Sequence, residues 1–198
     1  MRAFRPQLWL PAVALFGGAA LSLPPLRPLI EQSMAWHMLV QMPLLALGGW
    51  LVAGQDWSWK PLARLERFNR YGLTGFIVTT LIAGYWMIPS AIDRAVVMPE
   101  ADAAKIVTLW LCGGALRQSM RRAPLVAQLF FLGTTLPMMA WLGLYFATTE
   151  LRLCNAYSLE SQLAAGRGLV ALAGAAAALW LYHGVAGRVL STVWRPVK

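Results

Sequence analysis

Residues 34–50 read MAWHMLVQMPLLALGGW, a nearly continuous apolar stretch. Its polar and sulfur-containing residues recur three and four positions apart, so most of them share one face of a helix. Thioether sulfur and imidazole nitrogen are ligands of soft metal ions. The stretch therefore predicts an apolar helix with candidate metal ligands along one side. The residues concerned are Met34, His37, Met38, Gln41 and Met42.

The rest of the chain has the composition of a membrane protein. Of its 198 residues, 59% are hydrophobic and only 13% are charged, and the mean hydropathy is +0.56. A soluble domain carries roughly 25% charged residues. A helix needs ~20 apolar residues to cross ~30 Å of hydrocarbon, and six stretches reach or approach this length. We expect one domain, residues 1–198, forming an all-α, polytopic transmembrane bundle of about six helices in the lipid bilayer. The stretches are 8–23, 34–54, 71–92, 102–116, 124–148 and 168–187.

Two of these stretches, 8–23 and 102–116, differ from an ordinary membrane span. Residues 8–23 follow two arginines and resemble a signal peptide, but the segment SLPPLRPL after them is not a convincing cleavage site. We expect this first helix to be retained. Residues 102–116 are short for a complete span, and we expect them to cross the membrane as well; if they were only re-entrant, every later orientation would invert.

The basic residues predict how the helices are oriented. The chain has 17 Lys and Arg against 8 Asp and Glu. Because Lys and Arg are enriched in cytoplasmic loops, counting them over alternate segments places both termini in the cytoplasm, in what we expect to be a bacterial inner membrane. No basic run is interleaved with exposed aromatic residues, so we expect no nucleic-acid binding. Twelve of the 17 basic residues fall on the side expected to be cytoplasmic: Arg2, Arg5, Lys60, Arg64, Arg67, Arg70, Arg117, Arg121, Arg122, Arg188, Arg195 and Lys198.

This orientation brings the candidate ligands close to the outer face of the membrane. His37 lies about one turn, roughly 5 Å, below the outer interface. Met34, Met38 and Gln41 share its stripe, and Met138 lies just outward of the midplane on the fifth expected helix. Methionine and histidine bind Cu(I) without adding negative charge in a medium of low dielectric constant. The sequence therefore offers a candidate Cu(I) site made of these five residues.

Other interpretations of these residues remain open. Methionine commonly fills gaps in apolar cores, so the stripe can equally be packing. His37 can be a structural histidine bonded to a carbonyl or to Gln41, or an axial haem ligand paired with a methionine. No arrangement resembles a hydrolase triad or a dinucleotide loop, and we expect no enzymatic activity. Of the two cysteines, we expect Cys112 to pack as a small hydrophobe and no disulfide with Cys154.

Two segments resemble a known family. MAWHMLVQMPLL (34–45) resembles the His-Met helix of the caa3-type cytochrome c oxidase assembly factor family, and SLESQLAAGRGLVALAG (158–174) resembles a later segment of that family. His37 and Met38 match the first motif, and Glu160 and Gln162 match the second loosely. Gln41 stands where the family tends to have a second histidine. Together the segments cover about thirty of the 198 residues.

The resemblance implies a membrane protein that helps to supply copper to an oxidase. We therefore expect copper handling, or assembly of a copper-containing respiratory oxidase, at the periplasmic face. One alternative is a structural or accessory subunit of a larger respiratory or oxidising complex, without a metal of its own. A further alternative is a carrier of a single b-type haem that uses His37 and a methionine.

Overall fold

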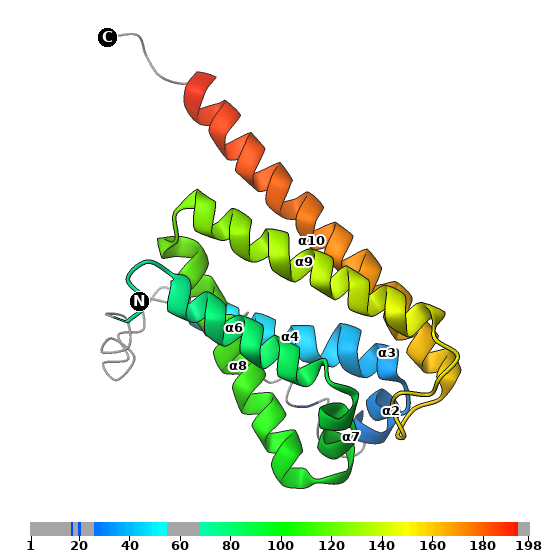
Figure 1. The fold of residues 1–198 in the computed structure, drawn as a ribbon. Coiled ribbons are helices and arrows are strands. Elements are labelled where there is room, and N and C mark those ends of the chain that lie inside the picture. The colour runs from blue at the N-terminus through cyan, green and yellow to red at the C-terminus, as the bar shows by residue number, and fades with distance from the viewer. Residues whose placement is uncertain (1–16, 18–19, 21–25, 55–67, 194–198) are drawn as a thin grey trace, which may run out of the picture.

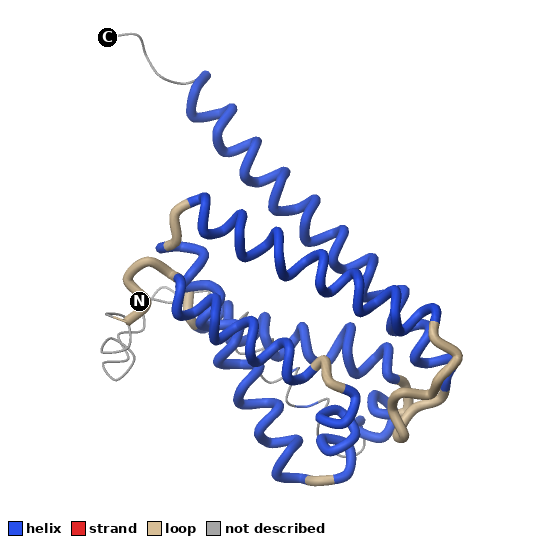
Figure 2. Tube along the Cα trace, viewed as in Figure 1, coloured by secondary structure: helices blue, strands red, loops and turns tan. Residues whose placement is uncertain are grey.

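The computed structural model describes residues 17, 20, 26–54 and 68–193. Every regular element in this part of the chain is a helix, which confirms the all-α prediction (Figures 1 and 2). The helices in chain order are α2 (Leu26–Glu31), α3 (Met34–Trp36), the π-helical turn η1 (His37–Gln41), α4 (Met42–Val52), α6 (Leu73–Trp86), α7 (Pro89–Val97), α8 (Pro99–Arg122), α9 (Leu125–Thr148) and α10 (Leu159–Val193).

Fewer helices than expected have the length and composition of a membrane span. Among the described residues, three qualify: Met34–Val52, Leu125–Thr148 and Leu159–Tyr182. The expected first span, residues 8–23, lies outside the described residues except for Gly17 and Ala20. The expected span 102–116 is part of α8, which is not among the three because charged side chains interrupt its apolar surface. The described residues thus contain three spans, or four if the bent pair is one span, where five of the six were expected.

The bent pair replaces the straight helix expected over residues 71–92. α6 and α7 meet at an angle of 72°. The cause lies at Pro89, the first residue of α7, because proline disfavours helical geometry in the residue before it. Ile88 accordingly has an extended backbone, with ψ at 124°. The bend sends α7 across the end of the bundle, over the N-terminal half of α8.

The helix that contains His37 changes its winding at that residue. The amide of Met42 donates to the carbonyl of His37, five residues earlier, which defines a π-helical turn. Pro43 follows directly, and a proline ring clashes with the carbonyl four residues before it. A wider turn ahead of the proline relieves this clash. Such turns are frequent at functional sites, and this one places His37 and Gln41 on the same buried side.

Close backbone contact holds α4 against α8. A Cβ atom added at Gly113 would lie 1.7 Å from the Ala46 carbonyl oxygen, and one added at Gly49 would lie 1.8 Å from that of Trp110. Only glycine permits this approach. Gly49 and Gly113 therefore let the backbones of α4 and α8 approach closely.

The last two helices form an antiparallel hairpin beside the first ones, and α10 extends well beyond the end of α9 (Figure 1). Gly143 and Gly166 lie at their crossing. The hairpin joins the other helices at both ends. At one end the rings of Phe76 and Phe131 stack with centroids 4.2 Å apart. At the other end α10 packs on α3 and η1, and this second junction contains the candidate site.

Candidate functional site

His37 is completely buried at the junction of η1, α8 and the loop before α10. Both ring nitrogens have partners. Nδ1 lies 2.7 Å from the hydroxyl oxygen of Tyr157, a residue 120 positions away in sequence. Nε2 lies 3.2 Å from Nζ of Lys105 on α8. The ring therefore faces polar groups inside the protein rather than lipid.

Lys105 is also completely buried, and its ammonium group is surrounded by acceptors. Besides His37, Nζ lies 3.4 Å from Gln41 Oε1 and 2.6 Å from Asp102 Oδ1. The contact with Asp102 is ionic rather than a well-aligned hydrogen bond. Glu31 Oε1 lies 3.8 Å away. A buried ammonium group needs such partners because its desolvation costs several kcal/mol, on the order of 20 kcal/mol in the idealised limit.

Arg27 completes a four-residue ion cluster with Glu31, Asp102 and Lys105. Its Nε donates to Glu31 Oε2 at 2.8 Å, and this bond raises the pKa of the guanidinium. A terminal nitrogen of Arg27 lies 3.8 Å from Asp102. Arg27 also donates to the carbonyls of residues 95 and 96, which close α7. Two cations thus balance two carboxylates, and the buried cluster is neutral.

The cluster determines the tautomer of His37. An ammonium group has only donors, so Nε2 must accept from Lys105. A neutral imidazole then carries its proton on Nδ1, and this N–H donates to the Tyr157 oxygen. Burial raises the pKa of Tyr157 far above its ordinary value, so the phenol stays protonated. The lone pair that a metal ion would need at Nε2 therefore points at Lys105.

The loop that carries Tyr157 is fixed from two sides. The side-chain amide of Gln162 on α10 donates to the Leu151 carbonyl at 3.1 Å and accepts from the Leu153 amide at 2.9 Å. On the other side, the carboxylate of Asp93 on α7 accepts from two amides of the loop. Because α7 reaches this loop only through the bend at Pro89, that bend contributes to the placement of Tyr157.

Three methionines of the predicted stripe are buried in the hydrophobic core at this end of the bundle. They are Met34, Met38 and Met42. From other elements, Met87 and Met139 pack against the same hydrophobic core. Thioethers from the C-terminal end of α6 and from α9 therefore pack against the same hydrophobic core as those of the His37 helix.

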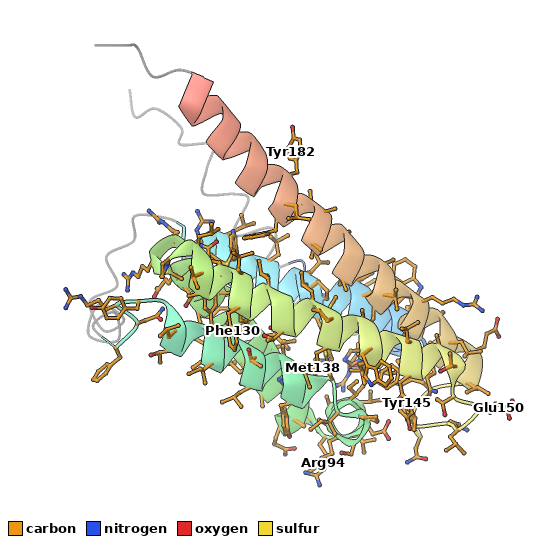
Figure 3. All side chains as sticks on the ribbon, turned by 45° about the horizontal axis from the view of Figure 1, so that its top comes forward. Arg94, Phe130, Met138, Tyr145, Glu150 and Tyr182 are labelled. Atoms are coloured by element: carbon orange, nitrogen blue, oxygen red, sulfur yellow. The ribbon has the colours of Figure 1, made fainter. Side chains whose placement is uncertain are left out.

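Met138 does not belong to this group. Its side chain is 72% exposed on the outer face of α9 (Figure 3). Adjacent residues on a helix point about 100° apart, so only one of Met138 and Met139 can face the bundle, and it is Met139. The expectation that Met138 lies beside His37 is corrected. Of the five candidate ligands, Met34, His37, Met38 and Gln41 are buried, whereas Met138 is exposed.

Sequence reasoning missed the residues that contact the histidine. Neither Lys105 nor Tyr157 was among the candidate residues. One signal was present: Asp102 and Lys105 are three residues apart within an apolar segment, where ionisable residues are costly and usually paired. Nothing in the sequence pointed to Tyr157, because its contact with His37 depends on the fold of the loop.

Neither cysteine offers a metal ligand beside His37. Cys112 is buried in α8, as expected for a packed hydrophobe, and Cys154 is buried in the loop. Burial raises the pKa of the Cys154 thiol to about 11, so it is not a thiolate at neutral pH. Among the described residues, no three His, Cys, Asp or Glu side chains are arranged to hold a metal ion. A metal at this site would depend on the thioethers.

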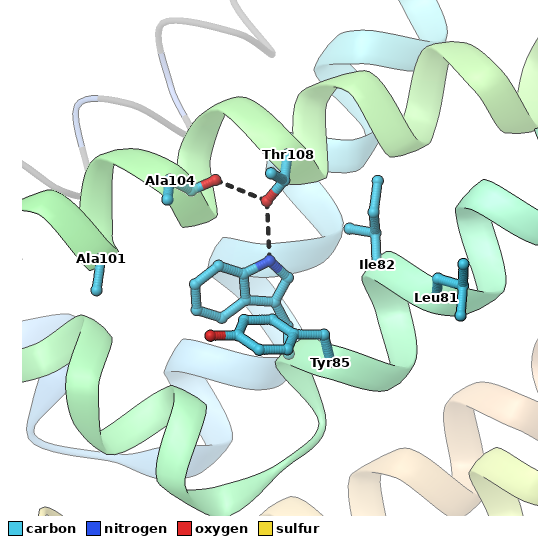
Figure 4. A pocket seen from close by; sticks show the side chains of 7 residues that line it. Leu81, Ile82, Tyr85, Ala101, Ala104 and Thr108 are labelled. Carbon is cyan, nitrogen blue, oxygen red and sulfur yellow. Dashed lines mark hydrogen bonds between the residues drawn. The ribbon is translucent and has the colours of Figure 1, made fainter.

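An apolar cavity lies elsewhere, between α6 and α8, with a volume of about 280 Å³ (Figure 4). Two of its polar groups are hydrogen bonded within the protein: Trp86 Nε1 donates to the Thr108 hydroxyl, which donates to the Ala104 carbonyl. No charged side chain lines it. The cavity therefore lacks the chemistry found around His37.

Comparisons with protein-family models, with curated proteins and with solved structures find no match for this chain.

Tyr157→Phe tests whether the hydroxyl supports the histidine. Removing it leaves the Nδ1 proton of His37 buried without an acceptor, and we expect the free energy of unfolding to fall by about 1–2 kcal/mol. The measurement is unfolding in mild detergent with increasing dodecyl sulfate. Tyr145→Phe is the matched control, because Tyr145 on α9 is half exposed. Equal stability of the two variants would contradict the inferred bond.

Proposed function

We propose that this protein is a multi-pass membrane protein that assists the assembly of a copper-containing respiratory oxidase and handles Cu(I) beside His37. One observation carries the proposal: the two segments that resemble the assembly factor family, far apart in sequence, are in contact. The backbone amide of Met34 donates to the hydroxyl of Ser161, and His37 bonds to Tyr157 just before the second segment. Gln162 of that segment anchors the loop.

The chemistry of the donors fits Cu(I) in part. Buried thioethers and one imidazole are ligands that a soft monovalent cation prefers. Against this, Nε2 of His37 contacts an ammonium group, so copper can use that nitrogen only after Lys105 moves. The fit is therefore that of a site that binds copper transiently. An assembly factor needs this property because it must release its metal.

The distribution of charge supports a periplasmic location. Arg117, Arg121 and Arg122 lie in the C-terminal part of α8, while Lys105 and the His37 cluster lie near its N-terminal end. Lys105 and Arg122 are 17 positions apart in sequence, which corresponds to about 25 Å along a helix. The positive-inside rule then favours the arginine end as cytoplasmic and the cluster as periplasmic. Six spans with both termini in the cytoplasm of a bacterial inner membrane complete this proposal.

A second candidate function is favoured by a specific observation. Both ring nitrogens of His37 are hydrogen bonded, so a purely structural role, joining η1, α8 and the loop, accounts for its burial as well. The protein would then be an accessory subunit of a respiratory or oxidising complex, without its own metal. Stable co-purification with such a complex, and no metal in it from this chain, would support this alternative.

The copper proposal is tested by titrating the purified protein with Cu(I) against a chromogenic chelator under reducing conditions. We expect about one equivalent to bind to the wild type, none to His37→Ala, and at least tenfold weaker binding to a Met34→Leu/Met38→Leu variant, because these changes remove the donors. Met138→Leu is the matched control and should bind as the wild type does, since Met138 faces outward.

Unchanged binding in His37→Ala would rule out this site. An absorption spectrum of the same preparation tests the haem alternative, because a b-type haem gives a visible absorption band. A colourless protein contains no haem and rules this alternative out. In cells, deletion of the gene should lower the activity of the copper oxidase, and added copper should restore part of it. Normal oxidase activity in the deletion strain would contradict a role in assembly.

A further inference from the structure

Arg117 lies near the C-terminal end of α8, is partly buried, and has no carboxylate partner among the described residues. Within this part of the chain its guanidinium donates one hydrogen bond, from a terminal nitrogen to the Trp50 carbonyl at 3.2 Å. Its Nε is buried without an acceptor. A guanidinium has five N–H donors and a permanent positive charge. Its charge and most of its donors are therefore unmatched by the described residues.

The guanidinium of Arg117 is held in place by the end of α4. It faces the ring of Trp50, with Cζ 5.6 Å from the ring centroid. It also lies against Gly54, just after α4, where an added Cβ atom would overlap it. The glycine therefore leaves the space that the charged group fills. A guanidinium held in this way is oriented before any ligand arrives, which lowers the entropic cost of binding one.

The contact with Trp50 places this charge at the membrane interface. Trp50 is in the last turn of the span Met34–Val52, and tryptophan is enriched where the hydrocarbon meets the headgroups. Because Arg117 bonds to the Trp50 carbonyl, the two residues lie at the same depth. Arg121 is exposed and lies one turn later on α8, about 6 Å further along the axis. The polar headgroups of the lipids occupy this depth.

The spacing of the two arginines indicates that an anion binds between them. Arg117 and Arg121 are four residues apart on α8, and like charges at this spacing lie side by side and repel each other. The carboxylate side chains of the described residues all lie elsewhere: on α2, on α7, in the first turn of α8, and in or just after the loop that follows α9. An anion shared by both guanidinium groups would replace the repulsion with two attractions.

We propose that Arg117 and Arg121 bind the phosphate of an anionic phospholipid, with the ring of Trp50 beside the headgroup. Phosphate fits because a guanidinium pairs with it through two parallel hydrogen bonds. The lipid is favoured over free phosphate because the site lies at the depth of the headgroups. In the orientation proposed above this end of α8 faces the cytoplasm, and anionic lipids of that leaflet attract basic groups beside membrane spans.

The experiment measures lipid binding to the purified protein by native mass spectrometry. The protein in mild detergent is titrated with phosphatidylglycerol or with phosphatidylcholine of the same acyl chains, in which choline cancels the charge of the phosphate. We expect the wild type to bind phosphatidylglycerol at least tenfold more tightly than phosphatidylcholine. Arg117→Gln should reduce this preference to within twofold, and Arg121→Gln should reduce it at least threefold, because each removes one guanidinium from the phosphate.

Arg94→Gln is the matched control, because it removes the same charge from an exposed arginine on α7, at the opposite end of the bundle. It should keep the preference of the wild type. Arg121 is exposed, so Arg121→Gln tests the site even when Arg117→Gln fails to fold. Equal losses in Arg94→Gln and Arg121→Gln would show that only net charge matters, and the proposal would be wrong.

Two further outcomes would overturn the proposal. If the wild type binds both lipids equally, Arg117 is an interfacial anchor only. If millimolar inorganic phosphate displaces phosphatidylglycerol from the wild type, the site takes a free anion and the assignment to a lipid is wrong; we expect the lipid to stay bound. Neither result depends on Cu(I) binding, so this proposal and the copper function can fail separately.

Discussion

Asp102→Ala is expected to lower the free energy of unfolding by about 3–5 kcal/mol, the usual cost of removing one partner from a buried ion pair. Its carboxylate lies 2.6 Å from the ammonium of Lys105 and 3.8 Å from the guanidinium of Arg27. Without it, two cations share the single carboxylate of Glu31. The excess positive charge remains in a site where the Lys105 side chain is inaccessible to water.

The measurement is unfolding by dodecyl sulfate in mild detergent, followed by circular dichroism. Glu100→Ala is the matched control: it removes a carboxylate from the same turn of α8, but Glu100 is exposed, so a change within about 0.5 kcal/mol is expected. Combining Asp102→Ala with Lys105→Leu should cost less than the sum of the two single changes, because the double variant leaves no unpaired lysine. Equal stability of the two alanine variants would show that the cluster is not energetically important.

Gly113→Ala should destabilise the protein by about 3 kcal/mol, the upper end of the usual cost of overpacking. Its added Cβ would lie 1.7 Å from the Ala46 carbonyl oxygen and 2.9 Å from the Trp50 amide nitrogen. These are backbone atoms of α4, which cannot turn aside as a side chain can. Relief therefore requires α4 and α8 to separate.

Gly114→Ala is the matched control for this substitution. It adds the same methyl group one residue later, where the nearest atoms are 3.7 Å away, an ordinary van der Waals distance. We expect it to be neutral or slightly stabilising, since alanine is the better helix former. Both variants are compared in the same detergent unfolding assay. Similar effects at the two positions would mean that the crossing is looser than the structure indicates.

The sequence predicted well those features that depend on local pattern. The apolar run expected at 124–148 corresponds to α9, Leu125–Thr148, because Pro124 excludes helix before it and the apolar residues last for a full span. The bend at Pro89 was accessible to the same reasoning, since proline restricts the residue before it.

Prediction failed where the direction of a side chain depends on a distant segment. Neighbouring methionines at 138 and 139 are equivalent in sequence, and only the packing of α9 on α10 selects which one faces inward. No local pattern in the sequence groups the charged residues at 27, 31, 102 and 105. They form one buried cluster because α7, bent away from α6, brings α2 and the start of α8 together.

The sequence by itself determined that this is an all-helical membrane protein, since a chain with so few charges and such long apolar runs satisfies its backbone in lipid by forming helices. It also determined that His37 and the methionines of its helix lie on one face. Only the tertiary structure decided what that face meets. Lys105 and Tyr157 reach His37 from 68 and 120 residues away, and such contacts are set by helix crossings and loop anchors, which no local periodicity encodes.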